Sequence, residues 1–169
     1  MSKNIVFIGE GPLFNNCLKF FFELYKKDFF VITKKSNKKK LNFLKKSCFK
    51  NFHYLDKIRD IKFLFSIMNE KIIKKNILKK SEFSLNFHDG PLPKYGGRYS
   101  STWAILNGED RHGCCWHLID QNIDTGKIIK KKVFKIEEED TSYSVDLKSL
   151  FFGLQMFKNI AINLINKKQ

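Results

Sequence analysis

Short apolar segments alternate with helical patterns along the first half of the chain, and this alternation constrains the fold more than any other feature. Residues 4–9 (NIVFIG), 28–33 (DFFVIT) and 61–68 (IKFLFSIM) are largely apolar runs of strand length, as expected of strands buried on both faces. Between the first two runs, residues 13–27 space their apolar side chains at helical intervals. This order favours an α/β domain built on a mostly parallel sheet that is flanked by helices.

The middle of the chain continues the alternation with weaker patterns. We expect a third strand at residues 52–55 (FHYL), a helix or helical turn at 69–80, and a further strand at 83–88 (FSLNFH). The last of these strands runs directly into a segment crowded with glycine and proline. The sequence therefore predicts a strand that ends abruptly in a loop at residue 88.

The order of predicted helices and strands changes beyond this loop. Residues 98–109 predict a helix, with Ser100 or Ser101 as its N-cap. Residues 112–120 and 126–136 predict two strands that are joined by a short loop and run antiparallel to each other. The sheet is thus expected to end in an antiparallel pair.

The C-terminal segment, after the acidic tract EEED at 137–140, predicts a last helix that packs on the sheet. Its apolar residues form one stripe at helical spacing: Leu147, Leu150, Phe151, Leu154, Phe157, Ala161 and Leu164. An apolar helix of this kind can also pair with a partner, so the oligomeric state is open and a dimer is one of the alternatives.

Length and composition are typical of a single soluble globular domain. The chain has 169 residues, of which 43% are hydrophobic and 29% charged. The most apolar stretch, CLKFFFELY, is interrupted by Lys19 and Glu23, so neither a membrane span nor a membrane partner is expected. The N-terminus has only four apolar residues in a row, which is too few for a secretory signal. We therefore expect a cytoplasmic protein whose four cysteines are reduced thiols.

The formal net charge of +15 raises the question of a polyanionic partner. Only Arg59, Arg98 and Arg111 are arginines, and the lysines are scattered in runs rather than interleaved with aromatic residues on one platform. The chain is also rich in Asn, Ile and Phe, a joint bias that accompanies Lys in A/T-rich coding sequences. A solvated basic surface is therefore favoured over a nucleic-acid partner.

Two short motifs suggest sites that the surrounding residues do not support. GEGPLF after the first strand has two glycines of a dinucleotide-binding fingerprint, but Phe14 stands where the third belongs. HGCCWH places His112, Cys114, Cys115 and His117 within six residues. In a strand these side chains alternate between faces and cannot close a tetrahedron, so no metal is expected.

The segment LNFHDGPLPKYGG at residues 85–97 carries a stronger signal. Asn86 and His88 are two residues apart, so both side chains point to one face of the strand, at the carboxyl end where open α/β sheets bind ligands. Asp120 and Asp124 occupy the loop between the last two strands and offer a carboxylate. Together an amide, an imidazole and a carboxylate suit acyl-type transfer, because they can donate hydrogen bonds to a developing oxyanion and move a proton.

At these residues the sequence closely resembles a known family. NFHDGPLPKYGG, WAILNGEDRHG and HLIDQNIDTG together resemble the formyltransferases that use 10-formyltetrahydrofolate, including the Asp that follows the His by 36 residues. The resemblance implies a Rossmann-like formyltransferase fold and a single catalytic domain over residues 1–169, with no C-terminal barrel or second domain. It also implies that Asn86 and His88 stabilise the oxyanion while Asp124 orients His88 and relays a proton.

The resemblance further implies how the substrates bind. The folate would contact two segments, made of Ser66, Ile67, Met68 and Asn69 and of Ile119, Asp120 and Ile123. The acceptor would contact a loop that contains Gly90, Pro91, Leu92, Lys94 and Tyr95, and His117 would support the site. No metal takes part in this chemistry.

The identity of the amine acceptor is less constrained. The family more often has Ser-Leu-Leu-Pro where this chain has Gly90-Pro91-Leu92-Pro93, and the variant is most similar to sugar-modifying and peptide-synthetase-associated members. An amino-sugar nucleotide or an aminoacyl or peptidyl amine is therefore the expected acceptor. The alternatives are methionyl-tRNA or glycinamide ribonucleotide formylation, formyltetrahydrofolate hydrolysis, and a non-catalytic basic binding protein.

Overall fold

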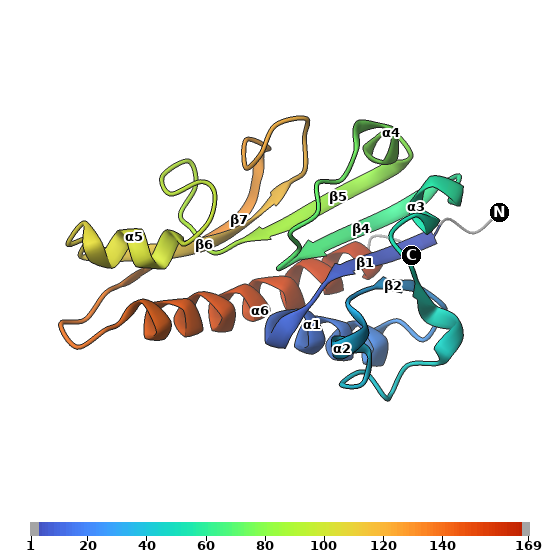
Figure 1. Ribbon diagram of the computed structural model, residues 1–169, viewed down its shortest axis with the longest axis horizontal. Helices are drawn as coiled ribbons and strands as arrows, with labels where there is room; N and C mark the ends of the chain where they lie inside the picture. Colours follow the sequence, from blue (N-terminus) through green and yellow to red (C-terminus); the bar gives the residue numbers. More distant parts are fainter. Residues whose placement is uncertain (1–3, 167–169) are drawn as a thin grey trace.

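The computed structural model describes residues 4–166, which form one seven-stranded sheet flanked by helices (Figure 1). The strands are β1 (Asn4–Gly9), β2 (Phe30–Ile32), β3 (Phe49–Lys50), β4 (Ile61–Ile67), β5 (Ser81–His88), β6 (Arg111–Leu118) and β7 (Ile128–Lys135), in the spatial order β3-β2-β1-β4-β5-β6-β7. Neighbours from β3 to β5 pair in parallel, and β6 is antiparallel to both β5 and β7. The predicted α/β architecture with an antiparallel C-terminal pair is confirmed.

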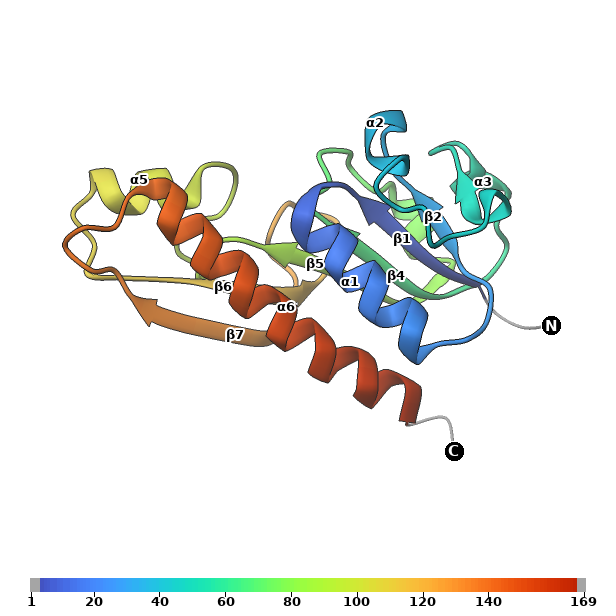
Figure 2. The same cartoon turned by 90° about the horizontal axis from the view of Figure 1, so that it is seen from below.

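Two long helices cover one face of the sheet, and the short helices α3 and α4 with their loops cover the other (Figures 1 and 2). The helices are α1 (Gly11–Leu24), α2 (Lys35–Lys38), α3 (Tyr54–Lys57), α4 (Lys75–Leu78), α5 (Ser100–Leu106) and α6 (Ser142–Asn166), with a 3₁₀ turn at Lys46–Cys48. In Figure 2, α1 and α6 lie side by side beneath the sheet. Among the described helices, none is both long and apolar enough to cross a membrane.

An aromatic cluster fills the layer between the sheet and the two long helices. The ring of Phe7 lies 4.7 Å from that of Phe65 and 5.0 Å from that of Phe21, and Phe157 stands edge-on to Phe65 at 5.4 Å. All four side chains are fully buried. Since each such side chain contributes roughly 1.5–3 kcal/mol on burial, this layer anchors β1 and β4 to α1 and α6.

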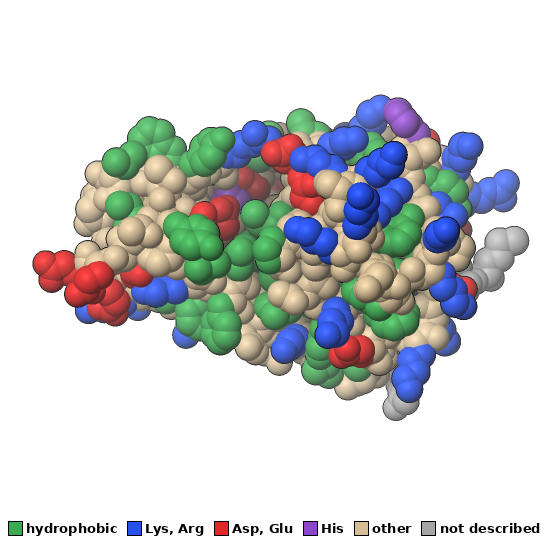
Figure 3. All heavy atoms as spheres, turned by 60° about the horizontal axis from the view of Figure 1, so that its bottom comes forward, with side chains coloured by type: hydrophobic (Ala, Val, Ile, Leu, Met, Phe, Trp, Pro, Cys, Tyr) green, Lys and Arg blue, Asp and Glu red, His purple; other side chains and the backbone are tan. Residues whose placement is uncertain are grey.

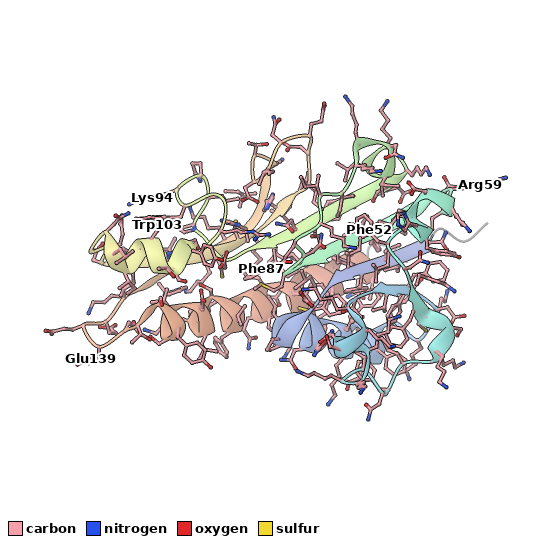
Figure 4. All side chains as sticks on the ribbon, in the orientation of Figure 1. Phe52, Arg59, Phe87, Lys94, Trp103 and Glu139 are labelled. Carbon is pink, nitrogen blue, oxygen red and sulfur yellow. The ribbon has the colours of Figure 1, made fainter. Side chains whose placement is uncertain are left out.

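Helix α6 packs through most of the apolar stripe expected from its sequence: Phe157 and Ala161 are buried, and Leu150, Leu154 and Leu164 pack against the core. Leu147 and Phe151 are the exceptions, with 47% and 58% of their surface exposed. The full set of buried residues in α6 is Val145, Ser149, Gly153, Met156, Phe157, Ile160 and Ala161. Gly153 lets α6 approach β5 closely, because a Cβ there would lie 2.4 Å from the Phe87 ring. Phe87 lies between β5 and α6 in Figure 4, and only a residue without a side chain allows this approach.

The helix or helical turn expected at 69–80 is the single turn α4. Two local predictions were wrong. The third strand is β3 at 49–50, while residues 52–55 form a turn and the start of α3. Neither serine caps α5: Tyr99 is the N-cap, because the Ser100 hydroxyl donates to the Asp89 carbonyl and that of Ser101 to the Asp146 carboxylate.

Candidate active site

Strand β5 delivers two polar side chains to the face of the sheet that lies opposite α1 and α6. Leu85 and Phe87 point into the core beneath the sheet, so Asn86 and His88 point to the other face, together as predicted. His88 is only 5% exposed and Asn86 is half-buried. On this face two loops rise beside the strand end in Figure 1, which we call the Gly/Pro loop (residues 89–97) and the Asp124 loop (residues 119–127).

The structure brings Asp124 to His88. One Asp124 carboxylate oxygen, Oδ2, lies 3.5 Å from His88 Nδ1 and accepts a hydrogen bond from the Gly97 amide at 2.8 Å. The other oxygen, Oδ1, lies 3.6 Å from Nε2 of His117. Asp124 is therefore held between two imidazole rings and tied to the end of the Gly/Pro loop.

The ring of His88 is oriented by a backbone carbonyl. His88 Nε2 lies 2.7 Å from the Tyr95 carbonyl oxygen. Because a carbonyl can only accept, Nε2 carries a proton, and Nδ1 is the nitrogen that faces the carboxylates of Asp124 and, at 4.0 Å, Asp89. Gly90 permits this arrangement, since a Cβ at this position would lie 2.7 Å from His88 Nε2 and 2.6 Å from the Tyr95 oxygen.

His117 links Asn86 to the same cluster. It stands opposite Asn86 on β6, and its Nε2 lies 3.2 Å from the Asn86 amide nitrogen. His117 Nδ1 lies 2.8 Å from the Leu118 carbonyl. Burial lowers the pKa of His117, which favours the neutral ring at this position.

The Gly/Pro loop is held by side chains from neighbouring elements. Lys131 of β7 donates to the carbonyls of Pro91 and Leu92, at 3.0 and 2.8 Å. At the outer end of the loop, where Lys94 is labelled in Figure 4, Glu109 accepts from the Tyr95 hydroxyl at 2.7 Å and pairs with Lys94 at 2.6 Å. These contacts give the predicted acceptor loop a defined shape around His88.

Four non-glycine residues adopt left-handed backbone conformations among the described residues, and all but Tyr99 lie in the segments that form the candidate site. They are Met68, Tyr95, Tyr99 and Asp124, with φ between 51° and 61°. This conformation is uncommon for side chains larger than hydrogen and concentrates at functional positions. At Asp124 it turns the carboxylate back towards the sheet instead of along the loop.

The residues expected to bind folate lie in two segments on this face. Ser66 and Ile67 are buried at the end of β4, Met68 is 42% exposed, and the Asn69 amide donates to the Lys71 carbonyl at 2.7 Å. Ser84 of β5 pairs with Leu64 of β4, two residues before Ser66. Its buried hydroxyl has no hydrogen-bond partner among the described residues. The Ser84 hydroxyl is enclosed by protein, so it contributes polarity beneath this face of β5 and not an exposed binding group.

In the Asp124 loop, the two acidic residues have different roles. The Asp120 carboxylate accepts from the Asn122 amide and the Thr125 hydroxyl of its own loop, so it shapes the loop. Ile119 packs against the core on this face, and Ile123 is 70% exposed. Sequence reasoning left both aspartates as candidates for the carboxylate, and the geometry selects Asp124.

A cavity of about 280 Å³ opens at the carboxyl ends of β1 and β2, beside Met68 and Asn69. Its polar lining includes Lys34, Lys38, Lys50, Lys71, Glu10 and Glu70. Lys34 pairs with Glu10 at 2.5 Å and lies 3.8 Å from Glu70. Figure 3 shows Lys and Arg side chains gathered over this end of the molecule, with acidic side chains at the opposite tip, where Figure 4 labels Glu139.

The cysteines near the site are unsuited to nucleophilic chemistry. Burial raises the pKa of Cys114 to about 12 and that of Cys115 to about 11, so both remain protonated thiols at neutral pH. Within residues 4–166, no group of three or more His, Cys, Asp or Glu side chains is arranged to hold a metal ion.

Comparison with known proteins identifies relatives of this arrangement. Residues 59–159 match the Formyl transferase family model. The bifunctional polymyxin resistance protein ArnA of Wigglesworthia glossinidia brevipalpis is 33% identical over 144 residues, which are 83% of this chain and 22% of the relative. The GDP-perosamine N-formyltransferase of Brucella melitensis is 33% identical over 81 residues, 48% of this chain and 31% of the relative.

Solved structures agree with the sequence matches. The crystal structure of WlaRD, a sugar 3N-formyl transferase in the presence of dTDP and 5-N-formyl-THF, superposes with a TM-score of 0.82 and 29% identity. The match covers 99% of this chain and 64% of the WlaRD chain. The present chain therefore spans about a fifth to a third of the two curated relatives and about two thirds of this structure.

Proposed function

The chain belongs to the formyl transferase family, and from this premise we propose that it transfers a formyl group from 10-formyltetrahydrofolate to the primary amine of an amino-sugar nucleotide. The observation that carries the proposal is the convergence of Asn86, His88 and Asp124 at one edge of the sheet, with Asp124 3.5 Å from the His88 ring. An amide, an imidazole and a carboxylate in this arrangement are the groups that acyl transfer to an amine requires.

The reaction exchanges one C–N bond for another. The amine nitrogen forms a bond to the formyl carbon, the bond from that carbon to the folate nitrogen breaks, and one amine proton is transferred to the leaving nitrogen. Negative charge that develops on the formyl oxygen would be stabilised by the side-chain N–H of Asn86 and, once His88 Nδ1 has taken up a proton, by the Nδ1–H of His88. Asp124 would stabilise that protonated ring and relay the amine proton, because its Oδ2 is the nearest carboxylate oxygen to Nδ1.

A 10-formyl folate would supply the activated formyl carbon. The segments at 66–69 and 119–123 would hold its pterin. Lys75 of α4 donates to Gln121 of the Asp124 loop at 2.8 Å, which ties the loop to α4 on this face.

The lysine-lined cavity supports a nucleotide acceptor. Lys50 and Lys71 line it without an ion-pair partner among residues 4–166, and their ammonium groups lie over aromatic rings at 5.1–5.3 and 4.9 Å. Ammonium groups at the rim of a cavity suit the phosphates of a nucleoside diphosphate sugar. The names of the relatives support the same class, since WlaRD is a sugar 3N-formyl transferase and the Brucella relative a GDP-perosamine N-formyltransferase.

The test is an acceptor panel. Purified protein is incubated with 10-formyltetrahydrofolate and each of GDP-perosamine, dTDP-3-aminofucose, methionyl-tRNA, glycinamide ribonucleotide and an aminoacyl thioester, and products are measured by mass spectrometry. The proposal predicts formylation of an amino-sugar nucleotide. Formylation of another acceptor alone would replace the proposed substrate class. Formate release without any amine would show hydrolysis, and no product from any mixture would contradict formyl transfer.

A further inference from the structure

We propose that His117 is a positioning residue that fixes the carboxamide of Asn86 in the orientation from which its amide group donates to the formyl oxygen. This inference rests on the proposed function and deepens it, because it assigns a task to a histidine that the reacting groups do not themselves require. Two hydrogen bonds of the His117 ring connect the Leu118 backbone carbonyl to the side chain of Asn86.

The first hydrogen bond sets the tautomer of His117. Nδ1 lies 2.8 Å from the carbonyl oxygen of Leu118, and a carbonyl oxygen can only accept. Nδ1 therefore carries the proton. In the neutral ring this leaves Nε2 with a lone pair, which makes Nε2 an acceptor.

The second hydrogen bond sets the carboxamide. Nε2 of His117 lies 3.2 Å from the side-chain nitrogen of Asn86, which donates one of its two N–H groups to the lone pair. A flipped amide would bring its oxygen against this lone pair, and two acceptors repel each other. The ring of His117, only 3% exposed, is held by Leu118 and cannot turn to relieve that contact without losing its own hydrogen bond.

The hydrogen bond to His117 fixes the direction of the remaining Asn86 N–H. With one N–H committed to His117, the second N–H of the same nitrogen is the donor available to the formyl oxygen. Asn86 lies beside His88 on the same face of β5, so both donors approach from one side. Without an acceptor at His117 Nε2, the amide can present its oxygen to the formyl oxygen and repel the developing charge.

Protonation of His117 would break the arrangement. An imidazolium has no lone pair at Nε2, and its new N–H would turn to the Asp124 carboxylate oxygen 3.6 Å away. The charged and titratable groups that face the ring are Asp124, Asp120 and His88, the last with its ring 6.4 Å away. Burial outweighs the two carboxylates and lowers the pKa of His117, which keeps the accepting form at neutral pH.

The experiment combines a mutant cycle with NMR. His117→Leu removes the acceptor, and His117→Gln can supply one through its side-chain oxygen. Each is made alone and in an Asn86→Ala background. The matched control is His112→Gln, because His112 is a buried histidine of the same strand whose ring contacts the Asp89 carbonyl and not Asn86. Single-turnover rates are measured together with the ¹⁵N tautomer pattern of His117 and the exchange of the Asn86 side-chain amide protons.

We expect His117→Leu to lower kcat about 10- to 100-fold, less than the loss of an oxyanion donor, with the KM of the folate within about threefold. His117→Gln should recover most of this loss. In the Asn86→Ala background His117→Leu should have less than about a twofold effect, whereas His112→Gln should act independently of Asn86. The wild-type protein should show the Nδ1–H tautomer and slowly exchanging Asn86 amide protons.

Any of three results would overturn the proposal. The first is a wild-type kcat in His117→Leu, and the second is a rate loss from His117→Leu that is as large in the Asn86→Ala background as in the wild type. The third is an Nε2–H tautomer of His117 in the wild-type protein. The NMR measurement needs no substrate. An inactive wild-type protein that shows the Nδ1–H tautomer and protected amide protons would therefore overturn the proposed function and support the hydrogen-bond assignment.

Discussion

Gly90 offers the sharpest test of how the Gly/Pro loop shapes the site. Its φ does not require glycine, so the substitution Gly90→Ala acts only through the added Cβ. That carbon would lie 2.6 Å from the Tyr95 carbonyl oxygen and 2.7 Å from His88 Nε2, the two atoms of the hydrogen bond that orients the His88 ring. Ordinary C···O contacts are about 3.3 Å or longer, so one side must move by roughly 0.7 Å.

The magnitude follows from that displacement. A misplacement of about 1 Å at a reacting group can cost on the order of 10²-fold in rate, which corresponds to about 2.7 kcal/mol of transition-state stabilisation. We therefore expect Gly90→Ala to lower kcat/KM by about 30- to 100-fold. The stability loss should stay within about 1–3 kcal/mol, the usual cost of overpacking.

The loop provides its own control. A Cβ at Gly96 would meet its nearest atoms at 3.7 and 3.9 Å, which are ordinary contacts, so Gly96→Ala should keep kcat/KM within about threefold of the wild type. The assay is formyl transfer at several donor concentrations, with thermal unfolding of both variants in parallel. Full activity in Gly90→Ala, or an equal loss in Gly96→Ala, would refute the reasoning. In a His88→Ala background, Gly90→Ala should have little further effect on rate.

Three further outcomes follow from the structure. Gly153→Ala should lower stability by about 1–2 kcal/mol by thermal or denaturant unfolding, since the clash with Phe87 at 2.4 Å exceeds the helix-propensity gain of about 1 kcal/mol; a stabilised variant would contradict this packing. His112 and His117 have pKa values lowered by burial, so the folded protein binds fewer protons than the unfolded chain, and its unfolding free energy should fall as pH drops below about 6.5. Urea unfolding at several pH values should show that this free energy depends less steeply on pH in His112→Gln than in the wild type. An equally steep pH dependence in the variant would contradict a neutral, buried His112. Lys131→Met removes the donor to two carbonyls of the Gly/Pro loop, so amide exchange in that loop should accelerate while exchange in α1 stays unchanged, and equal acceleration in both would contradict a local role.

Much of the fold and the core of the site were predictable from the sequence. The apolar runs located β1, β2, β4 and β5 because buried parallel strands carry continuous apolar side chains. The two-residue spacing of Asn86 and His88 placed both on one face without knowledge of the sheet. The remaining elements were harder: β3 has only two residues, and α4 is a single turn, so neither has a pattern long enough to recognise.

The contacts that refine the site depend on tertiary geometry. The hydrogen bond between Asn86 and His117 exists because β5 and β6 pair in one register, which sequence spacing alone does not define. The glycine at position 90 was noted as a departure from the family pattern, but its contact with His88 appears only once the loop is folded. Likewise, the close approach of α6 to β5 depends on one contact, the Phe87 ring against Gly153.

Single-turnover formyl transfer tests the central claim most directly. Wild-type protein, His88→Ala and Asp124→Asn are each saturated with 10-formyltetrahydrofolate, mixed with the amino-sugar nucleotide that the panel identifies, and quenched over time. The account predicts that both variants bind the folate donor with affinity close to that of the wild type and transfer the formyl group at least about 10²-fold more slowly. Transfer at the wild-type rate in either variant, with folate bound, would contradict the assignment of this cluster as the catalytic site.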